Sequence, residues 1–167
     1  MSDVPLVIID NIYFLEQGKS VLSKMRDDAY TCTQVPFELG GIGRHFRHVL
    51  DHYALFWKGF DGGVINYDDR ERDIEIEHKR RHAVLLFETI KHDLSNWAQT
   101  QPNLDRTLRV WHNGTWCQSS VGRELQHLIN HTVHHYAFVA LILGVLDEDV
   151  EDGFGVAPST LAAQMAP

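Results

Sequence analysis

The sequence predicts a single all-α domain over residues 1–167, a four-helix bundle with long crossovers and a small β-hairpin before the last helix. Four stretches carry apolar residues at helical spacing, which favours four amphipathic helices. The connections in the middle of the chain are long, and one aromatic run is split by Asn113-Gly114, a strong hairpin signal. A chain of 167 residues fits one hydrophobic core.

The first helix is predicted from Tyr13 to Ala29, because apolar side chains recur there three and four positions apart. The stretch from Tyr30 to Gly43 contains Pro36 and glycines that break regular structure, so an irregular connection is expected. The second helix is predicted from about Gly41 to Phe60, and Asp61-Gly62-Gly63 ends it.

The stretch from Asn66 to Arg81 is dense in charges of both signs, which predicts a solvated loop leading into a helix. The third helix is expected from about Glu77 to Gln99, where apolar residues form one stripe. Three of its histidines fall off that stripe and are predicted on the surface: His78, His82 and His92.

The hairpin is predicted over Leu108 to Cys117, an aromatic and β-branched run. The fourth helix begins after Ser119 or Ser120, either of which can cap free backbone amides, and continues to about Leu146. The tail is expected to be irregular, apart from a short turn that begins at Pro158.

Composition and sequence pattern disfavour several classes of function. The formal charge of −8 and the pI near 5.7 disfavour nucleic acid, which needs clustered Lys and Arg. No run approaches the ~20 consecutive apolar residues of a membrane span, and the first residues lack a signal peptide, so a cytoplasmic protein without a membrane partner is expected. Cys32 and Cys117 lack CxxC spacing and are predicted to be buried free thiols.

Histidine is the unusual residue, with eleven copies against fifteen Lys and Arg. On the fourth helix, His131 and His135 are one turn apart and share a face with His127 and Glu124, while His134 lies at its edge. An HxxxH pair lets two imidazoles bind one ion, although an isolated pair is more often satisfied by ordinary hydrogen bonds.

A second histidine cluster favours the metal hypothesis. His45, His48 and His52 are spaced three and four apart on the second helix, with Asp51 three residues after His48. Metal sites in bundles combine side chains from facing helices, so one of these histidines is expected as a third ligand. The helical wheel leaves that choice open, because His52 lies nearer the apolar stripe than His48 does.

The segments from Gly43 to His52 and from Asn130 to His135 resemble the DinB-like superfamily, which includes bacillithiol S-transferases. The resemblance covers most of the chain and implies a four-helix bundle in which His48, His131 and His135 ligate one divalent metal ion. The other histidines of the two helices then provide supporting hydrogen bonds or a fourth ligand.

Two functions are weighed. In the first, the protein is a metal-dependent transferase or hydrolase, in which a low-molecular-weight thiol binds an open metal position beside a small-molecule substrate. Glu124 is the candidate catalytic residue, for orienting a histidine or moving a proton, and Arg70 and Arg72 are weaker candidates for holding an acidic substrate. The metal is zinc, nickel or iron, since imidazole suits all three.

In the second function, the metal only fastens one helix to another and the protein is not a catalyst. An interaction module without metal is a third possibility. The aromatic hairpin around Trp111 and Trp116 also predicts a homodimer, because its exposed edge and rings would gain by burial.

Overall fold

The computed structural model describes residues 4–33 and 40–165, so residues 34–39 of the predicted connection lie outside the described part. Within those ranges the chain is mostly helical, as predicted. Its four long helices are α1 (Leu6–Lys24), α3 (Ile42–Phe60), α5 (Arg80–Ala98) and α6 (Val121–Val145), and its short helices are α2 (Asp27–Thr31), α4 (Ile74–His78) and α7 (Pro158–Met165). The strands are β1 (Val64–Ile65), β2 (Thr107–His112) and β3 (Thr115–Ser120).

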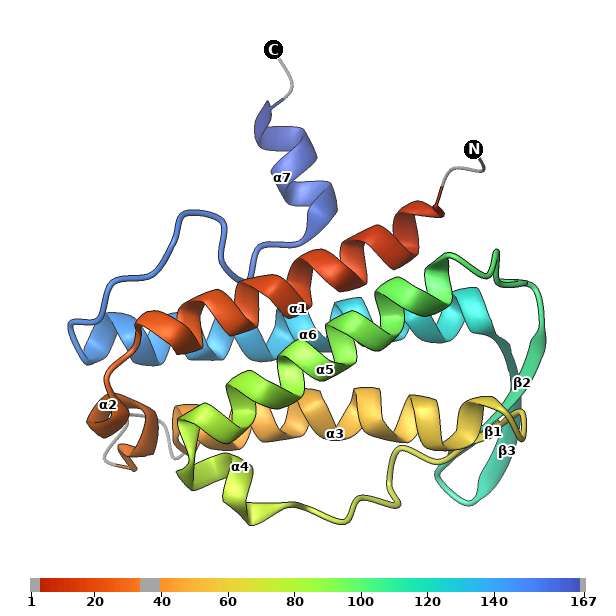
Figure 1. Cartoon of the computed structure of the whole chain (residues 1–167), viewed down its shortest axis with the longest axis horizontal. Coiled ribbons are helices and arrows are strands. Elements are labelled where there is room, and N and C mark those ends of the chain that lie inside the picture. The colour runs from red at the N-terminus through yellow and green to blue at the C-terminus, as the bar shows by residue number, and fades with distance from the viewer. Residues whose placement is uncertain (1–3, 34–39, 166–167) are drawn as a thin grey trace.

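The long helices lie side by side and bury one apolar core between them (Figure 1). Helix α1 contacts α5 and α6, and α3 also contacts α5 and α6. The apolar stripes expected from the sequence face inward, and each long helix contributes a fully buried aromatic or leucine side chain: Phe14, Phe46, Phe87 and Leu125. This packing fixes which faces of α3 and α6 oppose each other.

Hydrogen bonds made by buried polar side chains tie α1 to α3 and α6. The Asn11 side-chain amide donates to the Leu125 carbonyl over 3.1 Å and accepts from the Tyr53 hydroxyl over 2.8 Å. On the next turns, the Tyr136 hydroxyl donates to the Phe14 carbonyl over 2.9 Å. These bonds offset the cost of burying the polar groups and fix the axial register of the helices.

The prediction placed the start of the first helix, at Tyr13, too late in the sequence. Helix α1 begins at Leu6, where the Pro5 carbonyl accepts from the amides of Ile8 and Ile9. Asn11 interrupts the apolar pattern in the sequence, yet its side chain is fully buried and hydrogen-bonded. The helix also ends earlier than predicted, at Lys24, because Met25 and Arg26 adopt an extended backbone conformation before α2 begins.

The third predicted helix is two helices. Lys79 adopts φ −117° and ψ 86°, which separates α4 from α5. Asp73 caps α4 by accepting from the Glu75 amide, and the Tyr30 hydroxyl donates to the Ile76 carbonyl in the middle of it. This anchored turn ends the long loop that runs along α3 in Figure 1. The tail also contains more helix than the predicted turn, namely α7.

The predicted hairpin is present and belongs to a sheet with three strands in the order β1-β2-β3. Asn113 and Gly114 have φ of 45° and 85°, as the two central residues of a type I′ turn require. Strand β1 pairs with β2 in parallel, Val64 opposite Arg109. Two residues are too few to show an alternating pattern, so β1 was not predicted.

Both cysteines are free thiols, but the prediction that both are buried is wrong. Cys117 is exposed, since it lies on β3, whose residues are all exposed or half-buried. Cys32 is half-buried at the end of α2. Cys117 lines a pocket together with His52 and His127, which are described below, whereas Cys32 lines neither of the pockets beside the histidines.

Helix α6 is the one helix in the described ranges whose length and apolar composition would suit a membrane span. The central helix of a soluble protein passes the same test. Helix α6 contacts α1 and α3 and carries five polar histidine and glutamate side chains on or near one face. Most of its large apolar residues belong to the core of the fold, while Leu141 and Val145 are exposed.

Candidate metal centre

Three imidazoles meet between α3 and α6. His48 comes from α3, His131 and His135 come from α6, and one ring nitrogen of each lies within 4.8 Å of the others. The ring centroids are 4.8 Å apart for His48 and His131 and 4.6 Å apart for both other pairs. The structure therefore brings together the three residues predicted as metal ligands.

Local helix geometry explains the convergence. His131 and His135 are separated by one turn of α6, so their rings project from the same face. On α3, Phe46 and Val49 are fully buried in the core, and His48 between them turns toward α6. The opposed faces of two packed helices thus supply three nitrogen donors, the usual composition of an open metal site.

The three histidines are kept neutral by their surroundings. Burial, reinforced by the neighbouring imidazoles, lowers the pKa of His48 and His135 to about 3 and that of His131 to about 2. The His131 Nε2 atom is buried and has no hydrogen-bond partner. A neutral imidazole with an unused nitrogen is the form that binds a divalent metal, so these residues fit such an ion.

His45 supports His135 from α3. Their Nδ1 atoms are 2.9 Å apart, so one proton lies between them. When His135 carries that proton, its Nε2 keeps a lone pair for a metal ion, the tautomer that metal-binding histidines need. His45 is buried and its ring stacks on Phe138, with centroids 5.6 Å apart.

His48 has a different neighbour, the Arg70 guanidinium, whose Nη1 lies 2.6 Å from His48 Nδ1. Sequence reasoning placed Arg70 in a solvated loop, but the side chain is half-buried and its Nε atom is buried without a partner. Arg72, two residues further, is exposed as expected. The loop before α4 therefore reaches the histidine cluster through Arg70.

The remaining histidines of α3 and α6 lie around the cluster. Among the described residues, they do not belong to the group whose ring nitrogens converge. His52 stacks on His131 with centroids 3.7 Å apart, and its Nδ1 lies 2.9 Å from the His48 carbonyl. Burial lowers the pKa of His52 to about 4 and also lowers that of His127. His134 is exposed.

Glu124 is buried at the start of α6, where its carboxylate accepts from the Tyr67 hydroxyl over 2.9 Å and from the Ser119 hydroxyl over 2.5 Å. Tyr67 stacks on His52, with ring centroids 5.2 Å apart and planes at 12°. Glu124 thus reaches the cluster through Tyr67 and His52. Sequence reasoning missed Tyr67, whose only signal was an aromatic residue in a highly charged loop.

Two pockets flank the cluster. One, of about 520 Å³, is lined by His48 and His135 together with four arginines: Arg44, Arg47, Arg70 and Arg72. The other, of about 580 Å³, lies between α6 and the hairpin and is lined by His52, Tyr67, Trp111, Cys117, Glu124 and His127. We call them the arginine pocket and the hairpin pocket. The arginine pocket therefore gives access to His48 and His135, and the hairpin pocket gives access to His52 and His127 beside the cluster.

Fold and site together define the class: a mostly helical protein that gathers three histidines from two opposed helices at one point. Comparison with known families agrees with this class. The model of the DinB family matches residues 16–144, most of the chain, and the chain belongs to that family, a family of metal-binding proteins. The matched region spans α3 and α6 and therefore includes all three converging histidines.

A curated relative is FK506-binding protein 5 of Rhizopus delemar. It is 36% identical to this chain over 103 residues, which are 59% of this chain and 27% of that protein. The chain thus matches about a quarter of the relative's length. Most of that protein lies outside the similarity.

Proposed function

We propose that this protein binds one divalent metal ion through His48, His131 and His135. The convergence of three imidazole nitrogens within 4.8 Å carries the proposal. Zn–N distances of ~2.0–2.1 Å require ligand nitrogens a little over 3 Å apart, so small side-chain rotations complete the site. The pairwise contacts of α1, α3, α5 and α6 support the four-helix bundle that such sites commonly use.

We propose further that the protein is an enzyme, a metal-dependent transferase or hydrolase that uses a low-molecular-weight thiol and a small-molecule substrate. A divalent ion held by three neutral imidazoles would lower the pKa of a bound thiol, so that the nucleophilic thiolate exists at neutral pH. Pockets on both sides of the cluster support a reaction between two small molecules. A location in the cytoplasm and a lack of nucleic-acid and membrane partners remain part of this proposal.

In this proposal Glu124 is a positioning residue, which orients neighbouring side chains and does not contact the reacting atoms. Its carboxylate holds the Tyr67 hydroxyl, and Tyr67 holds the ring of His52 against His131. Burial and the nearby Glu124 carboxylate raise the pKa of Tyr67, so the phenol keeps its proton and donates a hydrogen bond to Glu124. The order of these contacts supports a stacked arrangement that keeps His131 aimed at the metal position.

A structural metal is the second candidate, and the position of His52 favours it. Its ring stacks on that of His131, with centroids 3.7 Å apart and planes inclined by 24°, and carries an imidazole nitrogen close to the cluster. A modest rotation could make His52 a fourth ligand and close the site to substrates. In that case the ion would fasten α3 to α6 and would not take part in a reaction.

Metal analysis of untagged protein tests the first step, with one equivalent of zinc, nickel or iron expected. Cobalt substitution then separates the two candidates. If the site is open, titration with small thiols produces a sulfur-to-cobalt charge-transfer band that is lost in His48→Ala. If no thiol changes the cobalt spectrum and His52→Ala weakens cobalt binding as much as His48→Ala does, the structural candidate replaces the enzyme.

A further inference from the structure

The arginine pocket concentrates positive charge in an acidic protein. Four of its lining residues are arginines and one, Glu77, is a carboxylate, whereas the whole chain has a formal charge of −8. Among the described residues, Arg47 is the one of these arginines with carboxylate partners, since it contacts Asp51 over 2.5 Å and Glu77 over 2.6 Å. Within residues 4–33 and 40–165, no carboxylate pairs with Arg44, Arg70 or Arg72.

Unpaired guanidinium groups around a concave surface raise the local concentration of anions. Arginine in particular binds carboxylate and phosphate oxygens with two parallel N–H donors. Arg70 offers such donors at the inner end of the pocket, where its Nη1 contacts His48 and its buried Nε has no partner. Arg47, fixed by its two carboxylates, supports the wall beside His48.

The contact between Arg70 and His48 cannot coexist with a metal on His48. The Arg70 guanidinium can only donate in this hydrogen bond, so His48 Nδ1 must be the unprotonated nitrogen and Nε2 must carry the ring proton. A metal on Nδ1 would displace Arg70 directly. A metal on Nε2 would require the proton to move to Nδ1, which would then no longer accept from Arg70. Metal binding therefore releases the guanidinium into the pocket.

We propose that the arginine pocket binds a small oxyanion with two negative charges, a dicarboxylate or a phosphate, and that Arg70 transfers from His48 to this anion when the metal binds. The proposal rests on the metal site proposed above and adds the chemical class of the molecule beside it. Each ligand should then raise the affinity for the other. The metal releases Arg70 for the anion, and the anion keeps Arg70 away from His48, where it would compete with the metal.

Calorimetric titration of the protein with malonate and, separately, with inorganic phosphate tests the pocket, first in metal-free and then in zinc-loaded protein. Acetate, with one charge, serves as the comparison ligand. We expect malonate or phosphate to bind the metal-free protein and to bind the zinc-loaded protein roughly tenfold more tightly. The better of the two identifies the ligand as carboxylate or phosphate in type.

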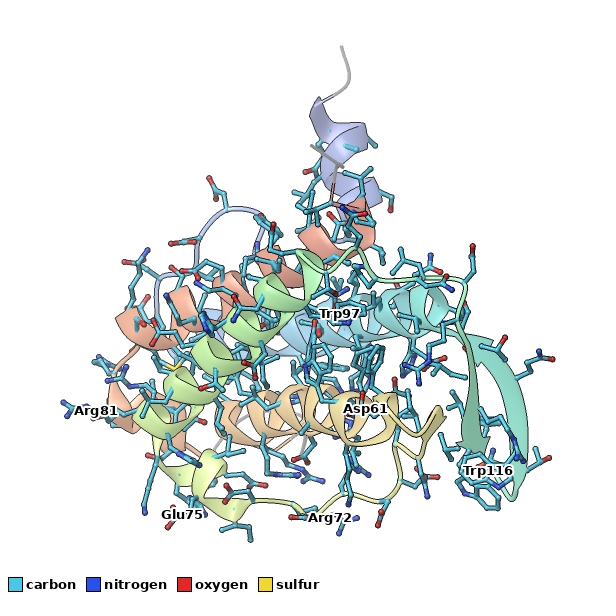
Figure 2. The ribbon with its side chains drawn as sticks, turned by 45° about the vertical axis from the view of Figure 1, so that its right-hand side comes forward. Asp61, Arg72, Glu75, Arg81, Trp97 and Trp116 are labelled. Carbon is cyan, nitrogen blue, oxygen red and sulfur yellow. The ribbon has the colours of Figure 1, made fainter. Side chains whose placement is uncertain are left out.

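Arg72→Gln and Arg44→Gln should each weaken anion binding by roughly five- to tenfold, since both side chains are exposed and their loss does not disturb the core. Arg81→Gln is the matched control, because Arg81 is an exposed arginine of α5 that does not line the pocket (Figure 2). Figure 2 shows Arg72, by contrast, on the loop before α4. Equal weakening in all three variants would overturn the proposal.

Arg70→Gln gives the most specific result, because its two expected effects have opposite signs. Anion affinity should fall, and zinc affinity measured without anion should stay equal or rise, since the competitor for His48 is gone. A residue that only supported the fold would lower both. Zinc binding with no anion binding in either state would overturn this inference and leave the metal site intact. Anion binding without zinc binding would instead overturn the metal site.

Discussion

The two sides of α6 bury polar side chains in different ways. Toward α1, three buried polar side chains are paired within the protein: Asn11 bonds to the Leu125 carbonyl and to Tyr53, and the Tyr136 hydroxyl bonds to the Phe14 carbonyl. Toward α3, several imidazoles crowd together instead, and the His131 Nε2 atom has no partner at all. Both regions belong to the same helix and the same core.

This difference distinguishes a structural polar network from a binding site. Paired groups such as Asn11 recover their desolvation cost through hydrogen bonds and gain nothing from an added ligand. The His131 imidazole has a lowered pKa, and its unpartnered Nε2 is a nitrogen that a metal ion would use. The α1 side should therefore control stability, and the α3 side should control metal binding.

The largest expected effect is on metal binding. His131→Ala or His135→Ala should lower the affinity for zinc by at least ~100-fold, because a three-imidazole site loses a direct ligand. Equilibrium dialysis with metal analysis measures this. His78→Ala and His92→Ala are matched controls, since both are exposed histidines of other helices and should leave zinc binding unchanged. Equal zinc retention in all four variants would contradict the assignment.

The converse experiment changes the α1 side. Asn11→Ala should lower the free energy of unfolding by about 2–3 kcal/mol, because the Tyr53 hydroxyl and the Leu125 carbonyl lose a buried partner. For a chain of this size the thermal midpoint should fall by roughly 4–12 °C. The folded variant should still bind zinc with unchanged stoichiometry. Loss of zinc with intact stability would remove the distinction between the two regions.

The metal-free protein should also depend on pH through the α3 side. Folding lowers the pKa of His48 and His131 from about 6.5 to about 3 and about 2, so the unfolded chain binds more protons between those values. The free energy of unfolding should therefore reach its full value with respect to these histidines above about pH 6.5 and should fall as the pH decreases below it. Burial raises the pKa of Asp51, which acts in the opposite direction nearer its own, lower pKa.

Thermal unfolding of chelator-treated protein from about pH 7.5 down to about pH 5 measures this dependence. A His131→Gln variant should show a shallower decline, and a His92→Gln variant should follow the unchanged protein. Saturating zinc should raise the thermal midpoint most at the upper end of this range, since protons compete with the metal for the imidazoles. A midpoint that does not change with pH would show that these histidines are not desolvated.

The two regions also differ in how far the sequence predicts them. The histidines of α6 were predictable because ligands one turn apart on one helix form a local pattern, and the resemblance to a known superfamily selected His48 over His45 and His52. The polar network of the α1 side was not predictable. Asn11 only interrupts the apolar pattern of its own helix, and its partners lie 42 and 114 residues away.

The surroundings of the metal site were missed for the same reason. Arg70 and Tyr67 lie in a charged segment without helical or strand periodicity, so nothing local indicates that their side chains contact histidines of α3. Periodicity predicts which face of a helix is buried, and it is silent about loops that return to that face. The break at Lys79 was hidden because α4 and α5 together preserve an apolar pattern that one helix could produce.

The smallest expected effect concerns the exposed end of the hairpin, which lies outside both regions. Trp116 is 39% exposed and packs against Trp111, with ring centroids 5.2 Å apart, and β3 is an edge strand of the sheet. Figure 2 shows Trp116 at the far end of the hairpin, away from the long helices. Edge pairing between two copies would bury these rings, so a homodimer is predicted.

That dimer should be weak. The Arg109 guanidinium already lies over the Trp116 ring, 5.3 Å from its centroid, which satisfies part of that surface in the monomer. Light scattering over a wide concentration range should show a monomer that dimerises at roughly micromolar to millimolar protein, typical of small interfaces. Trp116→Ser should shift the equilibrium to the monomer and leave zinc affinity unchanged, because the hairpin tip is not part of the histidine cluster. A protein that remains monomeric at every accessible concentration would exclude this dimer, and a Trp116→Ser variant that loses zinc would show that the hairpin acts on the cluster through the pocket they share.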